Sequence, residues 1–75
     1  MVGRARRPVR VPDLTGMATS DAAGLLREVG LRAGLVHLTF SREFDSGIVF
    51  DQEPAAGVNV ERGQPVDLTV SSGLR

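Results

Sequence analysis

The chain has 75 residues, nine basic and nine acidic residues, 41% apolar residues and no cysteine. This length allows one small domain that buries about 60% of the surface of its unfolded chain, which leaves no room for an enclosed active site. The lack of cysteine excludes disulfides and thiolate metal sites, so packing alone must stabilise the fold. No apolar run approaches the ~20 residues of a membrane span, and the N-terminal region lacks the apolar stretch of a secretory signal.

The charge is unevenly distributed along the chain. The first ten residues contain four arginines and no acid, whereas the rest contains five arginines and nine acidic residues. We interpret residues 1–8 as a basic disordered arm or linker, and the alternative is contact with a nucleic acid or another anionic surface. No aromatic residue lies between the arginines to stack on bases, so we expect no nucleic-acid binding.

One segment has the apolar spacing of a helix. Positions i, i+3, i+4 and i+7 of residues 19–29 are apolar, at Ala22, Leu25, Leu26 and Val29. Thr19 or Ser20 is expected to cap the start with a side-chain oxygen. Gly30 follows the last apolar position and favours a left-handed helix stop.

Four segments are predicted to be extended: residues 9–13, weakly, and residues 35–40, 48–53 and 65–71. Pro54 has no backbone N–H to donate, so the strand of residues 48–53 must end before it. Gly57 then suits a turn with positive φ. These elements predict an α+β fold in which one helix packs on a three-stranded antiparallel sheet, with a short extended N-terminal segment.

Between residues 11 and 73, about two dozen residues stand in a characteristic order and spacing. They are Val11, Pro12, Asp13, Leu14, Gly16, Ala22, Leu26, Gly30, Leu31, Gly34, Val36, Ser41, Gly47, Val49, Gln52, Pro54, Ala56, Gly57, Val60, Gly63, Val66, Leu68, Val70, Ser71 and Gly73. Together they resemble a PASTA domain. Ala18 departs from the pattern, because the family often has a capping Thr or Ser there. The resemblance implies a domain over residues 9–73, between the arm of residues 1–8 and a tail of residues 74–75.

PASTA domains are modules of bacterial penicillin-binding proteins and membrane serine/threonine kinases. The resemblance therefore implies an extracytoplasmic domain that binds or senses peptidoglycan fragments (stem peptides or muropeptides) or β-lactams, beside a neighbouring catalytic domain. Other members act as spacers or protein-interaction domains without a ligand, and this remains the alternative. A single copy resembles the module of a penicillin-binding protein more than the tandem arrays of the kinases.

Catalysis is not expected. His37, the single histidine, alternates with Val36 and Leu38 and should face outward, where no Cys or second His can complete a site. The glutamates are spread over a helix, a loop and strand ends, so no pair is poised for acid and base roles. We therefore predict no enzyme activity, no cofactor and no metal site.

The topology predicts two candidate binding sites. The helix start, Thr19 and Ser20, should lie at the same end as the 41–47 loop, where Arg42 could bind a ligand carboxylate together with helix-start amides. Arg32 and Arg62 should lie at the opposite end and form a competing site. The alternative is that all three arginines are solvated surface charges.

Overall fold

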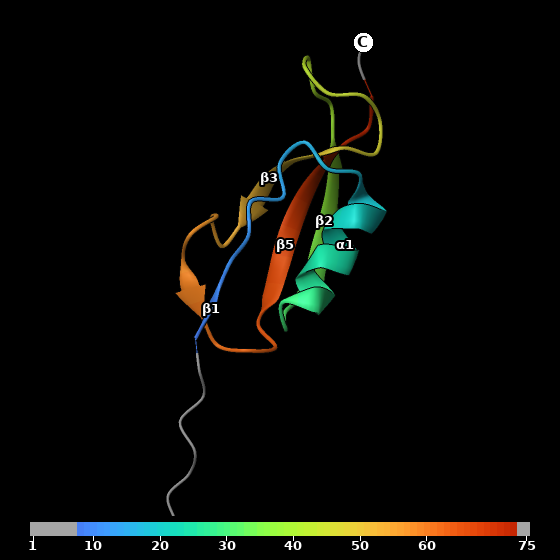
Figure 1. Cartoon of the computed structure of the whole chain (residues 1–75). Coiled ribbons are helices and arrows are strands. Elements are labelled where there is room, and N and C mark those ends of the chain that lie inside the picture. The colour runs from blue at the N-terminus through green and yellow to red at the C-terminus, as the bar shows by residue number, and fades with distance from the viewer. Residues whose placement is uncertain (1–7, 74–75) are drawn as a thin grey trace, which may run out of the picture.

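The computed structural model describes residues 8–73; of the predicted arm and tail, residues 1–7 and 74–75 lie outside the described part. The elements, in chain order, are β1 (Val9–Arg10), α1 (Thr19–Glu28), β2 (Arg32–Thr39), β3 (Val49–Glu53), β4 (Asn59–Val60) and β5 (Pro65–Ser71). Figure 1 shows α1 packed against a sheet of β2, β5 and β3, with β1 and β4 at its side. The α+β prediction, one helix on three strands, is confirmed.

The sheet is mixed, and the prediction of an antiparallel sheet was wrong. Its order is β2-β5-β3, with β5 antiparallel to β3 and parallel to β2. The prediction treated β2 and β3 as neighbours because they follow each other in sequence. Neighbouring strands lie about 4.8 Å apart, so the segment between Thr39 and Val49 is long enough to cross over the end of β5.

The N-terminal segment pairs with a short strand that the sequence did not reveal. β1 and β4 are antiparallel, with Val9 opposite Val60. Backbone bonds from Val11 N to Val58 O (2.8 Å) and from Gly57 N to Val11 O (2.8 Å) continue this pairing to the turn. Gly57 has a φ of +90°, which confirms the predicted positive φ.

The core lies between α1 and the sheet. Its buried apolar side chains are Val11, Leu14, Ala22, Leu26, Leu31, Val49, Val66, Leu68 and Val70. The alternation predicted for residues 65–71 is confirmed, because every second side chain of β5 from Val66 to Val70 is buried. Apolar burial contributes roughly 25 cal/mol per Å², so these nine side chains dominate the stability of the fold.

The two ends of α1 differ from each other in how well they were predicted. At the C-terminal end Gly30 has a φ of +91°, and Leu31 N donates to Leu26 O (2.8 Å), which confirms the left-handed stop. The capping prediction for Thr19 or Ser20 was wrong. Ala18 is the N-cap residue, and its methyl side chain has no oxygen to accept a cap bond. The Thr19 hydroxyl donates to Gly47 O instead.

β2 is an edge strand whose second half is exposed. Val36 and Leu38 pair with Leu68 and Val70, so their side chains lie on the face of the sheet that carries α1. They nevertheless remain 48% and 69% exposed. His37 lies on the other face and is exposed, as the alternation predicted.

Candidate functional site

The helix start and the 41–47 loop meet at one end of the molecule. Gly47 O accepts bonds from Thr19 N (3.0 Å) and from Thr19 Oγ1 (2.9 Å), and Gly47 N donates to Ser71 O (2.8 Å). Both donors of Thr19 are therefore used inside the fold and are not directed at a ligand. Ser20 is exposed on the first turn, and Asp21 beside it contributes a negative charge at the helix start.

The loop that carries Arg42 is held by side-chain bonds. Ser41 Oγ accepts from Glu43 N and from Phe44 N (both 3.1 Å), and Ser71 Oγ donates to Phe44 O (2.7 Å). The Phe44 ring also stacks on Phe50, with ring centroids 6.0 Å apart. Arg42 itself is exposed on this ordered loop, next in sequence to the exposed carboxylate of Glu43.

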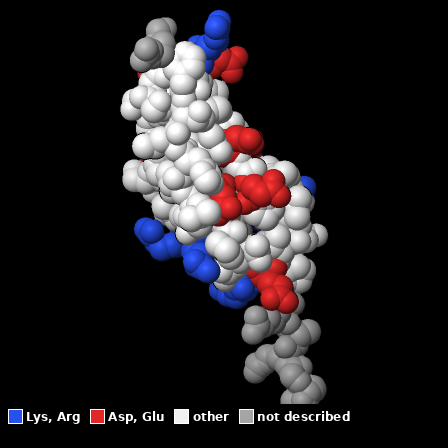
Figure 2. Space-filling view, turned by 180° about the vertical axis from the view of Figure 1, so that it is seen from behind, with Lys and Arg blue, Asp and Glu red and all other residues white. Residues whose placement is uncertain are grey.

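Arg32 and Arg62 lie together where α1 ends. The backbone of Gly63 donates to Gly30 O (2.7 Å), and Arg32 Nε donates to Gly63 O (3.2 Å). The Arg62 guanidinium lies over Gly30, 3.0 Å from the position that a Cβ atom would take there. Arg27 occupies the last helical turn, and Figure 2 shows basic side chains gathered at this end of the molecule. The negative end of the helix dipole favours these cations.

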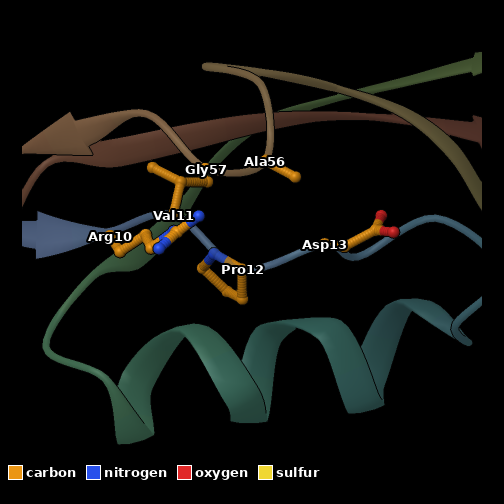
Figure 3. Close-up of a pocket in the computed structure, with 6 residues that line it drawn as sticks. All are labelled: Arg10, Val11, Pro12, Asp13, Ala56 and Gly57. Carbon is orange, nitrogen blue, oxygen red and sulfur yellow. The ribbon is translucent and has the colours of Figure 1, made fainter.

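An open groove that the sequence did not predict lies beside the 54–57 turn. It has a volume of about 420 Å³ and is lined by Arg10, Val11, Pro12, Asp13, Ala56 and Gly57. Figure 3 shows the Arg10 side chain beside Gly57 and the Asp13 carboxylate farther along the same segment. No sequence signal could have found this groove, because it forms only when residues 10–13 pair with the turn.

The Asp13 carboxylate accepts two hydrogen bonds from Thr15. The Thr15 hydroxyl donates to Asp13 Oδ1 (2.7 Å), and Thr15 N donates to the same oxygen (3.1 Å). These two bonds, the hydroxyl bond first, hold the pKa of Asp13 below its ordinary value of 3.8. The carboxylate therefore stays ionised at the mouth of the groove.

We expect Thr15→Val to raise the pKa of Asp13, because the stronger of the two stabilising bonds is removed. A lowered native pKa contributes stability above the unfolded value, and this contribution is lost as the pH falls through the native pKa. The variant should therefore lose less stability than the wild type on acidification below pH 3.8. An NMR titration of the Asp13 carboxyl carbon measures the shift, and an unchanged midpoint would contradict it.

The sheet face turned away from α1 carries acidic side chains. Glu53 pairs with Asp67 across β3 and β5, and Asp51 is two residues before Glu53. Figure 2 shows acidic atoms on this side of the molecule. Within residues 8–73, no group of three His, Cys, Asp or Glu side chains is arranged to hold a metal ion. In the same range no helix is long and apolar enough to cross a membrane.

Comparison with known proteins identifies the family. The model of the PASTA domain matches residues 9–72. The chain belongs to the PASTA domain family. It is 42% identical over 73 residues, 96% of its own length, to "Probable serine/threonine-protein kinase PknB" of Corynebacterium glutamicum. It spans only 11% of that kinase.

Solved structures support the same fold. The three-PASTA-domain structure of a Ser/Thr kinase from Staphylococcus aureus superposes with a TM-score of 0.83 at 25% identity, covering 89% of this chain and 33% of that one. The entire extracellular region of the Ser/Thr kinase PrkC from the same organism gives a TM-score of 0.80 at 27% identity, over 84% of this chain and 22% of that one. The predicted PASTA resemblance is confirmed, and the PASTA domain is a non-catalytic part of these kinases.

Proposed function

We propose that this PASTA domain is an extracytoplasmic, non-catalytic recognition module that binds peptidoglycan stem peptides or muropeptides weakly. The observation that carries the proposal is the match to the extracellular region of a Ser/Thr kinase over 84% of this chain. The relatives compared above are kinases, so we propose a kinase rather than a penicillin-binding protein as the parent. The neighbouring partner would then be the kinase's own catalytic domain.

Within the domain, we favour the Arg32 and Arg62 end over the Arg42 end as the carboxylate site. Two guanidiniums converge there around Gly30 and Gly63, and guanidinium groups bind carboxylates in a forked geometry. At the other end both Thr19 donors are bonded to Gly47, and the acidic side chains of Asp21 and Glu43 oppose an anion. The two converging guanidiniums are therefore the observation that favours the first end for a stem-peptide or β-lactam carboxylate.

The exposure of these arginines limits the expected affinity. Arg32 and Arg62 are both exposed, so a bound carboxylate stays partly hydrated and its ion pairs are screened. We expect a single copy to bind with a Kd of about 0.1 to 1 mM, roughly 4 to 5.5 kcal/mol. Neighbouring PASTA copies on the same chain would raise the avidity for a polymer.

A muropeptide titration followed by backbone amide shifts tests this function. We expect shifts at residues 30–32 and 61–64, and an approximately three- to tenfold weaker Kd in Arg62→Gln and in Arg32→Gln, because each removes one charged hydrogen-bonding partner. Arg42→Gln is the matched control and should bind like the wild type. A muropeptide with an amidated C-terminus should lose most of the affinity.

Two results would redirect the proposal. Shifts confined to residues 19–22 and 41–47 that disappear in Arg42→Gln would move the site to the helix start. No shift at several millimolar muropeptide or β-lactam would favour the alternative, a spacer or protein-interaction domain without a ligand. The internal use of the Thr19 donors is the observation that favours this alternative.

A further inference from the structure

The outer edge of β2 carries the largest exposed apolar side chains of the described residues. Their exposed fractions are Leu35 65%, Val36 48%, Leu38 69% and Phe40 44%, and the remaining member of this class is Val58 at 43%. Four of the five lie on β2 or directly after it, with Val36 and Leu38 on the face of the sheet that carries α1 and Leu35 on the opposite face. A strand paired with this edge would contact exposed apolar side chains on both faces, whereas single exposed apolar residues need no explanation.

The backbone at this edge is free to pair. Leu35 N donates to Asp67 Oδ1 (2.9 Å) and Thr39 O accepts from Ser72 N (2.9 Å), so these odd-numbered residues direct their backbone groups toward β5. Backbone groups alternate in direction along a strand, so those of Val36 and Leu38 point away from β5. Within residues 8–73 no strand lies on that side, because β2 is the end of the order β2-β5-β3.

We propose that a second copy of this chain pairs with β2 through this edge, antiparallel and across a two-fold axis at His37. In that register Val36 of each copy lies opposite Leu38 of the other, and Leu35 lies opposite Thr39. The two Val36–Leu38 pairs are hydrogen-bonded pairs, and they extend the sheet from three strands to six. The register uses Leu35, which lies in the irregularity between Ala33 and Val36, and the four residues of β2 that follow it.

The charge pattern of the strand identifies a second copy as the occupant. From Ala33 to Ser41 the chain contains no Asp, Glu, Lys or Arg. Self-pairing therefore brings no like ionised charges together. Charged side chains on an edge strand usually prevent such pairing, and this strand has none. A charged partner strand would find no complementary charge here. One strand pair falls in the class of small, transient interfaces of less than about 1,200 Å², so we expect a Kd near 1 mM.

Sedimentation and amide shifts of the 75-residue chain at pH 8, from about 0.05 to 3 mM, test the proposal. We expect concentration-dependent dimerisation with dilution shifts confined to residues 33–41. Leu38→Lys should weaken dimerisation at least about tenfold, because it places a charge inside the apolar pair. Val58→Lys is the matched control, since Val58 is, like Leu38, an exposed large apolar residue but lies outside β2.

Far-UV circular dichroism and melting check that both variants are folded. At 69% exposure, the Leu38 position should tolerate lysine. The proposal is overturned by a wild-type chain that stays monomeric at 3 mM, or by dilution shifts centred outside residues 33–41. It is also overturned if the dimer persists in Leu38→Lys, or is lost equally in Val58→Lys. Because no muropeptide is present, the result is independent of the proposed carboxylate site.

Discussion

Gln52→Met should lower the stability of the domain by about 2 to 4 kcal/mol, although the two side chains are similar in size. Gln52 is 9% exposed, and its Oε1 accepts from Leu14 N (2.8 Å). Its Nε2 donates to Pro12 O (2.9 Å) and to Pro54 O (3.2 Å). The side-chain amide of Gln52 therefore connects the end of β3 to the extended segment of residues 12–14 and to the turn that follows β3.

The loss of stability in Gln52→Met arises mainly from buried polar groups that lose their hydrogen-bond partner. Leu14 is fully buried, and a methionine at position 52 has no oxygen to accept the bond from Leu14 N. The unpaired donor therefore adds a desolvation penalty of about 1 to 3 kcal/mol to the loss of the hydrogen bonds. A domain of this size has roughly 4 to 11 kcal/mol of stability. We expect the melting temperature to fall by about 10 to 25 °C.

Gln64→Met is the matched control, because Gln64 is exposed in the turn before β5. It should change the stability by less than about 0.5 kcal/mol. Urea unfolding followed by circular dichroism measures both variants. A Gln52→Met midpoint within experimental error of the wild type would show that the three bonds contribute nothing net.

The elements whose residues follow a regular local pattern were predicted correctly from the sequence. Val66, Leu68 and Val70 alternate with polar residues, and each meets the core because β5 is the central strand. Gly30 ends α1 through bonds within six residues, so its conformation could be predicted from nearby sequence alone. β4 has only two residues and therefore no alternation to detect.

Contacts between distant segments were the ones that could not be predicted. The Thr19 hydroxyl bonds to Gly47, 28 residues away, so it is unavailable for the local cap that the sequence favoured. In the sequence Gln52 is one more residue of a predicted strand, and its hydrogen bond from Leu14 N, 38 residues away, has no local signal. The parallel pairing of β2 with β5 is non-local in the same sense, since nothing in either strand specifies its neighbour.

The candidate sites divide in the same way. The convergence of Arg32 and Arg62 depends on a bond between Gly63 and Gly30, and the topology of helix and strands was enough to anticipate which end would carry them. The groove beside Arg10 depends on the pairing of residues 10–13 with the 54–57 turn, and the weakly extended N-terminal segment gave no sign of it.

Gly34→Ala should destabilise the domain by about 2 to 3 kcal/mol through a steric conflict inside the sheet. The Asp67 carboxylate occupies the space that a Cβ atom on Gly34 would need, and the side chain of Pro65 lies 3.1 Å from the same position. Asp67 cannot move without loss, because its Oδ1 accepts the bond from Leu35 N at the irregularity in β2. The added methyl group must therefore displace either this bond or the strand.

A double-mutant cycle separates the conflict from a general effect of alanine. Asp67→Ala alone should cost about 1 kcal/mol for the lost bond, and it also removes the carboxylate that the new methyl group meets. The double variant should therefore be more stable than the sum of the single effects by at least about 1 kcal/mol. Gly24→Ala is the control, because a Cβ atom at Gly24 meets nothing within 4 Å and alanine favours the helix by about 1 kcal/mol. Additive single effects at Gly34 and Asp67 would show that the carboxylate is not what requires glycine there.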